Sequence, residues 1–345
     1  MKKIKTKDAV GHILCHDITQ IIKDVSTGAL FKKGHVIQQE DVEKLLDLGK
    51  GHLYIYEADE NMLHENDAAE ILYQACANIN MTPTPVSEGK IEVIANADGL
   101  LKVDINRLGA INELGELIIA TRQNHSVVKK GDKLAGTRII PLMIHKTKLE
   151  AVKKIIANTP LLEIKPFHPF KVGVIATGNE VYHGRIQDTF SPVIHQKLAT
   201  YNLNVNYQKT VPDQIEMIKA AIFEGLKQGS DLIICTGGMS VDPDDLTPAA
   251  IKAAGAEILT YGAPLLPGSM LLIGYIENKI PIIGLPGCAM YAKATSFDLL
   301  LPRILAKDLI TKREIASLGH GGYCLKCSPC TFPNCGFGRG GGWKI

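Results

Sequence analysis

KVGVIATG, residues 171–178, is an apolar run of strand type that ends in a glycine turn. A second such run, DLIICTGG, covers residues 231–238, and a third, IPIIGLPG, covers residues 280–287. The segments between the three runs have helical character. Strands that alternate with helices predict a parallel sheet with helices on both faces. We therefore expect a doubly wound, mostly parallel α/β domain in this half of the chain.

The predicted helices begin at recognisable signals. In Ser191-Pro192 and in Thr247-Pro248, a hydroxyl residue at the expected N-cap precedes a proline at the first helical position. Pro212 opens a third helical segment after a strand that ends at Val211. We expect the connections in this domain to follow the βα order throughout.

The remaining sequence divides at two proline-bearing linkers, residues 81–86 and 160–169. Upstream of the first linker, residues 39–48 and 65–79 carry apolar side chains at helical spacing. The predicted organisation has four parts, namely an N-terminal α+β segment (1–80), a β-rich domain (81–165), the α/β domain (170–306) and a cysteine-rich tail (307–345).

The composition excludes several classes of function. Hydrophobic residues make up 46% of the chain and charged residues 21%, and the formal net charge is +2. Such a balance gives no field that would attract nucleic acid or a membrane surface. The basic start MKKIKTK lacks the apolar stretch of a signal peptide, and no apolar run is long enough to span a bilayer. We expect a cytoplasmic protein whose ligand is a small molecule.

Glycine turns follow three of the predicted strands, in Thr177-Gly-Asn-Glu180, Thr236-Gly-Gly238 and Leu285-Pro-Gly287. Ligands of an open parallel sheet bind beyond the carboxyl ends of its strands. Glycine lets the backbone approach an anion closely, and exposed N–H groups supply positive potential there. Each motif alone is also explained by a tight turn. Together they predict a site for a phosphate-like ligand.

Acidic residues gather near the same turns. Glu180 and Asp188 follow the first turn, Asp213 follows the strand that ends at Val211, and Asp242-Pro-Asp-Asp245 follows the second turn. Carboxylates beside a phosphate repel it unless a divalent cation lies between them, which favours Mg²⁺. The alternative for residues 242–245 is a solvated turn that caps the next helix.

These motifs occur in an order typical of one family. They are Thr177-Gly-Asn-Glu-Val181, Gly184-x-Ile-x-Asp188, Val211-Pro-Asp213, Thr236-Gly-Gly-Met-Ser-Val241 and Gly284-Leu-Pro-Gly287. The set resembles the molybdopterin-binding domain (MoaB/Mog-like) shared by molybdenum insertases and molybdopterin adenylyltransferases. The resemblance implies binding of molybdopterin or adenylylated molybdopterin, with Mg²⁺ and molybdate as further ligands.

The resemblance also implies roles for individual residues. The residues expected to contact the cofactor are Thr177, Gly178, Asn179, Glu180, Thr236, Gly237, Gly238, Ser240, Pro286 and Gly287. Asp188 and Asp245 are the implied catalytic carboxylates, and Asp242 and Asp245 the implied Mg²⁺ ligands.

The chain departs from the insertase pattern at two places. Insertases carry lysines in a Lys-Pro-Gly-Lys-Pro segment associated with holding molybdate, and this chain has Leu266-Pro-Gly-Ser-Met270 instead. The Pro-Gly-Asn-Pro turn is replaced by Pro286-Gly-Cys-Ala289. Cofactor binding is therefore better supported than metal insertion. His183 and Arg185, close to the first turn, are our candidates for the compensating positive charge.

Four cysteines crowd the tail in the pattern Cys324-x2-Cys327-x2-Cys330-x4-Cys335. Four thiolates can hold Zn²⁺ or an iron–sulfur cluster. The spacing approaches that of bacterial ferredoxins, with one extra residue before the last cysteine. His320 is a further candidate ligand, and thiol redox pairs or a reactive disordered tail are the alternatives. Without apolar periodicity, the segment is expected to gain little order by burial.

Three functions remain open at this stage. The first is an enzyme that resembles molybdopterin molybdenumtransferase and inserts molybdate into adenylylated molybdopterin with the help of Mg²⁺. The second is a non-catalytic protein that binds or senses the cofactor and works through its metal-binding tail. The third is a nucleotide pyrophosphatase of the competence-damage type. A homodimer, usual in insertases, is the expected assembly.

Overall fold

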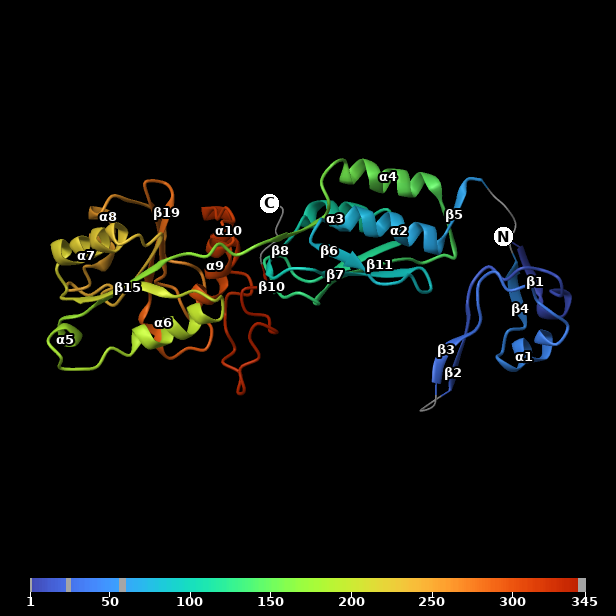
Figure 1. Ribbon diagram of the computed structural model, residues 1–345, viewed down its shortest axis with the longest axis horizontal. Helices are drawn as coiled ribbons and strands as arrows, with labels where there is room; N and C mark the ends of the chain where they lie inside the picture. The colour runs from blue at the N-terminus through green and yellow to red at the C-terminus, as the bar shows by residue number, and fades with distance from the viewer. Residues whose placement is uncertain (1, 23–25, 56–59, 341–345) are drawn as a thin grey trace. The chain divides into compact units, whose positions relative to one another are not determined.

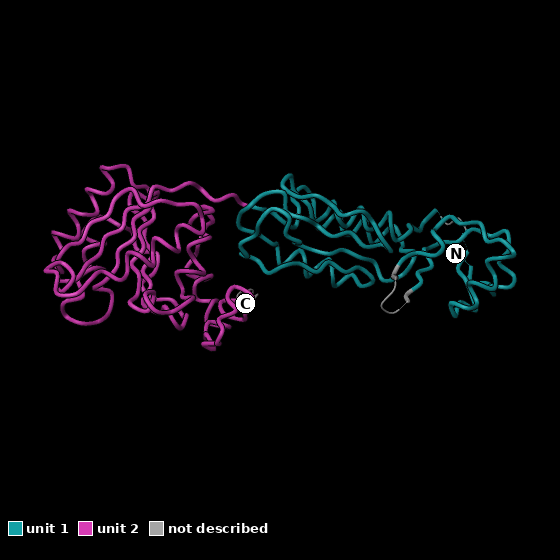
Figure 2. The backbone as a smooth tube through the Cα atoms, turned by 60° about the horizontal axis from the view of Figure 1, so that its bottom comes forward, with its two compact units in different colours: residues 1–164 teal, residues 165–345 magenta. Residues whose placement is uncertain are grey.

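A computed structural model of the chain describes residues 2–22, 26–55 and 60–340 (Figure 1). It contains two compact units, residues 1–164 and residues 165–345 (Figure 2). The finer division into four parts stays a prediction. Among the described helices, none has both the length and the apolar character needed to cross a membrane.

Unit 1 is built from short strands and a few helices. In chain order these are β1 (Lys2–Lys5), η1 (Thr6–Asp8), β2 (Ile18–Ile22), β3 (Ser26–Phe31), α1 (Asp41–Asp47), β4 (His52–Ile55), β5 (Met62–His64), α2 (Glu65–Cys76), β6 (Met81–Pro83), β7 (Lys90–Ala95), β8 (Gly99–Val103), α3 (Ile105–Asn112), β9 (Leu117–Thr121), β10 (Val127–Val128), β11 (Lys133–Ile139), β12 (Met143–His145), α4 (Lys146–Ile156) and β13 (Leu162–Lys165).

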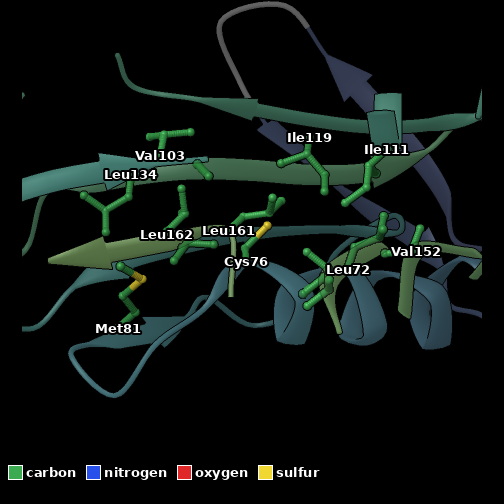
Figure 3. Packing of buried hydrophobic residues seen from close by; sticks show 14 of the residues in the cluster. Leu72, Cys76, Met81, Val103, Ile111, Ile119, Leu134, Val152, Leu161 and Leu162 are labelled. Atoms are coloured by element: carbon green, nitrogen blue, oxygen red, sulfur yellow. The ribbon is translucent and has the colours of Figure 1, made fainter. Parts of the chain in front are cut away.

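Helix α2 packs against a four-stranded sheet of order β6-β7-β11-β9. Its apolar residues, which include Ala68 and Leu72, lie on one face because they recur at helical spacing. Figure 3 shows Leu72 and Cys76 among Ile119 and Leu162 in this core. The two helices predicted from periodicity are confirmed as α1 and α2. Since α2 shares its core with β7 and β11, this helix is packed with the sheet that follows it in the chain.

Unit 2 contains the predicted α/β domain. Its elements are β14 (Val172–Thr177), α5 (Asn179–Tyr182), α6 (Phe190–Ala199), β15 (Val205–Val211), α7 (Ile215–Lys227), β16 (Leu232–Thr236), α8 (Thr247–Ala253), β17 (Ala256–Tyr261), β18 (Leu272–Ile276), β19 (Ile280–Leu285), η2 (Gly287–Met290), α9 (Ser296–Leu305) and α10 (Lys312–Ser317).

A six-stranded sheet of order β15-β14-β16-β19-β18-β17 forms the centre of unit 2. The first four strands in this order are parallel to one another. Helices α6 and α9 share a core with the face that carries Val172 and Val174, whereas α7 and α8 share a core with the face that carries Ile175. Side chains of a strand alternate between faces, so an apolar strand supplies both cores. The doubly wound, mostly parallel fold is confirmed.

The expectation of βα connections throughout is wrong at one edge. β17, β18 and β19 follow one another without a helix, and both neighbouring pairs are antiparallel. Glu277 and Asn278 have positive φ angles of 52° and 56°. Two consecutive residues in this region make the tight turn of a hairpin, which needs no covering helix. The pairing of β17 with β18 contains a bulge between Ile258 and Thr260.

All three predicted helix starts are displaced. Ser191 and Pro192 lie inside α6, which begins at Phe190, and α8 begins at Thr247 after Leu246. Helix α7 begins at Ile215, three residues after Pro212. In each case the proline still falls at or just before the first turn, where its missing N–H costs nothing.

The described part of the tail, up to residue 340, packs on unit 2, contrary to the expectation from its composition. Phe337 is only 4% exposed and belongs to the core under α6 and α9. Phe332 packs edge-on to it, with ring centroids 6.4 Å apart. Tyr323 forms a bridge with Leu266 in the preceding loop. Two aromatic side chains and a backbone pairing therefore hold this segment in place. Its sequence, which has no apolar periodicity, does not indicate these contacts.

Candidate functional site

The register of the sheet brings the three glycine turns to one edge. Ala176 lies opposite Thr236, and Thr236 lies opposite Leu285. All three strands are parallel, so the turns that follow them leave the same edge of the sheet. Since β14 leads to α6 on one face and β16 leads to α8 on the other, their ends flank a switch point of the topology.

The turn after β16 is pressed against the end of β14. Gly237 has a φ angle of 83°, and a Cβ at this position would overlap the carbonyl oxygen of Thr177. Gly238 has a φ angle of 53°, and its Cβ would lie 2.8 Å from Oγ1 of Thr247. Both the backbone angles and the close approach require glycine here. The turn is therefore a packed corner whose backbone comes as near as possible to β14.

Hydroxyl groups join the two sides of this corner. Thr177 and Thr247 are buried, and their Oγ1 atoms are 3.0 Å apart. The backbone N–H of Thr247 donates to the carbonyl of Gly238 at 3.2 Å. Thr247 was absent from the residues assigned to the site, because its position before a proline indicated only a helix cap. Thr236, which was assigned to it, is buried at the end of β16.

An acidic side chain just after β15 completes the corner. The backbone N–H of Asn179 donates to Oδ2 of Asp213 at 2.8 Å, and the N–H of Asp213 donates to Oδ1 of Asn179 at 3.3 Å. Oδ1 of Asp213 is buried and has no hydrogen-bond partner of normal geometry in the described chain. The sequence placed Asp213 at this edge but assigned it no role. Its position directly after a parallel strand was the available signal.

Burial raises the pKa of Asp213, and the negative charges of Glu180 and Asp245 raise it further. The hydrogen bond from the Asn179 backbone acts in the opposite direction. Two neighbouring carboxylates that disfavour the ionisation of Asp213 create a demand for positive charge. The corner therefore combines backbone N–H groups, two hydroxyls and an acidic cluster.

The predicted Mg²⁺ ligands Asp242 and Asp245 form a turn. The N–H of Asp245 donates to the carbonyl of Asp242 at 2.9 Å, and the N–H of Asp242 donates to Oδ2 of Asp245 at 3.2 Å. Asp242 is exposed. Within residues 2–22, 26–55 and 60–340, no three His, Cys, Asp or Glu side chains already surround a metal-sized point.

Tyr261 of β17 fixes the loop that contains Ser240. Its hydroxyl lies 3.0 Å from the carbonyl oxygen of Met239 and 3.3 Å from that of Ser240. The buried side chain of Met239 lies over Gly284, where a Cβ would come within 2.6 Å of its sulfur. Tyr261 was not predicted as part of the site, because the antiparallel edge that positions it was not predicted either.

Asp188 caps helix α6. It accepts hydrogen bonds from the backbone N–H groups of Phe190 at 2.9 Å and Ser191 at 3.0 Å, and from the Ser191 hydroxyl. These are the contacts of a helix N-cap, although they come from a residue one position upstream of Thr189. A catalytic role for Asp188 stays a prediction. His183 and Arg185, in the segment before it, are exposed.

The turn after β19 differs from the packed corner. A Cβ on Gly287 would meet no atom within 4 Å. Pro286 precedes it, and Cys288 follows in η2 with a half-buried thiol. Burial raises the pKa of this thiol, and a hydrogen bond with the Gly268 backbone lowers it. This end of the edge is therefore open.

The four tail cysteines are free thiols, with Cys327 and Cys330 exposed and Cys324 and Cys335 half-buried. They lie in the part of unit 2 that packs on α9. His320 contacts the backbone carbonyl of Gly340, with its Nδ1 atom 3.3 Å from that oxygen.

Two parts of the chain match known families. Residues 173–306 match a family described as a probable molybdopterin binding domain. Residues 3–57 match a domain of unknown function. The first match contains every glycine and acid of the candidate site.

Curated relatives carry the name molybdopterin molybdenumtransferase. The protein from Haemophilus influenzae is 25% identical over 313 residues, which cover 87% of this chain and 71% of the relative. The protein from Staphylococcus aureus is 29% identical over 154 residues, which cover 43% of this chain and 36% of the relative. The chain thus spans about a third of the length of the second relative.

Solved structures similar to unit 2 include the molybdopterin biosynthesis enzyme MoaB from Thermus thermophilus, at 26% identity and a TM-score of 0.33. The match covers 39% of this chain and 91% of that one. The tungsten cofactor synthesizing protein MoaB from Pyrococcus furiosus has 24% identity and a TM-score of 0.33, with 39% and 92% covered.

Proposed function

We propose that the molybdopterin-binding domain of residues 173–306 holds its pterin ligand at the packed corner between β14 and β16. One observation carries the proposal. The turns that begin at Thr177 and at Thr236 and the carboxylate of Asp213 meet at one switch point of the sheet. A phosphate at this corner would accept hydrogen bonds from the N–H groups of the glycine turn.

The acidic residues fit a divalent cation. Oδ1 of Asp213 is buried without a normal partner, and the pKa of this carboxyl is raised by burial and by its acidic neighbours. Asp213 and Asp245 are the residues that we expect to hold Mg²⁺. When bound, the cation supplies positive charge between these carboxylates and the phosphate of the ligand. Asn179 then orients Asp213 through the paired hydrogen bonds described above.

The finer proposal is that the chain inserts molybdate into adenylylated molybdopterin. In such a reaction the protein positions the reactants and neutralises charge. Incubation with adenylylated molybdopterin, molybdate and Mg²⁺ should release AMP, measured by chromatography. Release that does not depend on molybdate would overturn insertion.

A second candidate is cofactor binding without insertion. The segment Leu266–Met270 contains no cation, and its Leu266 backbone pairs with the tail instead. Insertases place lysines here, and a cation is the natural partner of an oxyanion such as molybdate. Tight pterin binding without AMP release would favour this candidate over the first.

Binding itself is tested with Asp213→Asn and a matched control, Glu216→Gln. Glu216 is an exposed carboxylate in the first turn of α7, so its loss removes the same charge away from the corner. We expect wild type and Glu216→Gln to retain pterin, detected by the fluorescence of its oxidised form. Asp213→Asn should weaken Mg²⁺-dependent binding about tenfold or more, since one ligand of the cation is lost. Equal binding by all three proteins would overturn the site. Size-exclusion chromatography of the same samples tests the expected homodimer.

A further inference from the structure

The four tail cysteines lie in a closed loop. The N–H of Gly338 donates to the carbonyl of Gly321 at 2.9 Å, so residues 321–338 begin and end at the same place. We call this segment the cysteine loop. It contains Cys324, Cys327, Cys330 and Cys335 and none of the other cysteines.

Both ends of the cysteine loop are docked on unit 2. The N–H of Cys324 donates to the carbonyl of Leu266, and the N–H of Leu266 donates to the carbonyl of Gly322, both at 2.8 Å. At the other end Phe337 is buried in the core, and a Cβ on Gly338 would overlap the side chain of Leu299. The loop thus leaves and rejoins the body at fixed points.

Between these anchors the loop has little to hold it together. Residues 325–331 contain no helix or strand, and most of their side chains are exposed. Fixing the backbone of each residue costs conformational entropy, and exposed side chains offset little of that cost. Small segments without a core are commonly held by disulfides or a metal centre. The cysteines here are free thiols.

One thiol already accepts a backbone hydrogen bond. The backbone N–H of Lys326 donates to Sγ of Cys324 at 3.5 Å. Lys326 has a φ angle of 55°, a left-handed conformation that turns its N–H toward the sulfur two residues earlier. N–H donors of this kind also surround metal-bound cysteines. The left-handed backbone of Lys326 is unfavourable for a residue with a side chain, and a turn that ligates a metal would explain it.

We propose that the cysteine loop binds a [4Fe–4S] cluster through Cys324, Cys327, Cys330 and Cys335. Structural zinc sites take two cysteine pairs separated by a long stretch of chain, whereas three cysteines at successive x2 intervals are typical of a cluster with four separate iron corners. Cys324 and Cys335 stand at the docked side. Cys327 and Cys330 are exposed, so they are free to turn toward the other two on ligation.

The loop is attached to a segment that also borders the open turn after β19. Leu266 pairs with the loop, and Gly268, two residues later, lies against Ser296 at the start of α9 and within hydrogen-bonding reach of Cys288 in η2. A cluster in the loop would therefore fix the backbone that borders the open end of the edge. This proposal is independent of pterin binding, because it concerns different residues and a different ligand.

The test uses the full-length protein under anaerobic conditions and a synthetic [4Fe–4S] cluster ligated by small thiols. In the exchange each cysteine thiol replaces one small thiolate, which leaves with the cysteine proton, so no oxidant is needed. We expect about four irons and four sulfides per chain after removal of free cluster, with the broad visible absorption of a thiolate-ligated cluster. The double variant Cys327→Ser/Cys330→Ser should lose at least half of the iron.

The matched control is Cys15→Ala, which removes a buried cysteine of unit 1. It should bind as much iron as wild type, and circular dichroism should give the same spectrum for all three proteins. Absence of iron in wild type, or equal iron in the double variant, would overturn the proposal. Uptake of one zinc per chain in place of the cluster would overturn it as well, in favour of a mononuclear site. Pterin fluorescence recorded on the same samples separates this outcome from failure of the proposed function.

Discussion

The packed corner between β14 and β16 and the open turn after β19 both contain glycine, but for different reasons. At the corner, Gly237 adopts a left-handed φ and touches the backbone of β14, so that no side chain fits. After β19, Gly287 has free space around it. A glycine that is required by the fold and a glycine that leaves room for a ligand look alike in a sequence. Their difference lies in what the neighbouring strand brings up against them.

The largest effect is expected from Gly237→Ala. Its Cβ would overlap the Thr177 carbonyl, and the left-handed φ alone costs about 1–2 kcal/mol for a residue with a Cβ. With the steric strain, we expect a loss of about 3 kcal/mol or more in the free energy of unfolding, measured by urea denaturation. A loss below about 1 kcal/mol would show that the backbone around Gly237 shifts easily to accept a methyl group. Gly237 and Gly287 would then not differ in their need for glycine.

The next effect is expected from Asp213→Asn and depends on pH. The pKa of Asp213 is raised in the folded protein, so its ionisation opposes folding. This cost is absent below the unfolded pKa of about 4 and grows as the pH rises through the folded pKa. At neutral pH the variant should be more stable than wild type, while its ligand binding is weaker.

Thermal melting of both proteins between pH 4 and pH 8 measures this difference. The gain should shrink as the pH falls, since the wild-type carboxyl becomes protonated. A gain that stays constant with pH would mean that the charge of Asp213 is not what strains the corner.

A smaller effect is expected from Asp188→Ala. Loss of an N-cap acceptor costs about 1 kcal/mol, and Asp188→Asn should restore most of it because asparagine caps equally well. Chemical denaturation gives both values. If Asp188→Asn has normal stability but no AMP release, the carboxylate acts in the reaction as well as in the cap.

The smallest effect on stability is expected from Gly287→Ala. The new methyl group meets open space, so the free energy of unfolding should change by less than about 0.5 kcal/mol. Pterin binding should nevertheless fall if the ligand lies against this backbone. Destabilisation comparable to that of Gly237→Ala would erase the distinction between the two turns.

Much of the α/β domain follows from sequence patterns. The apolar runs that became β14, β16 and β19 are buried on both faces, and such strands need no alternation to be recognised. The edge where their turns meet follows from parallel pairing. For this reason the sequence places Thr177, Gly178, Gly237 and Gly238 at the same edge of the sheet. Their contact with a ligand stays a prediction.

Other features depend on contacts between distant parts of the chain. Whether Thr247 serves only its own helix or also faces Thr177, 70 residues earlier, is decided by the packing of α8. The hairpin of β18 and β19 was missed because its turn uses Glu277 and Asn278 rather than glycine. The order of the tail rests on Phe337 entering a core formed by other segments. None of these is visible in local periodicity.

The bulge in β17 gives the sheet edge an influence on the loop after β16. Successive side chains of a strand point to opposite faces, so the extra residue between Ile258 and Thr260 decides which way Tyr261 points. That hydroxyl holds the carbonyls of Met239 and Ser240. Deletion of one residue from the bulge would turn the ring away and release the loop while leaving every predicted ligand residue in place. β17 thus fixes the loop after β16 although none of its residues is a predicted ligand.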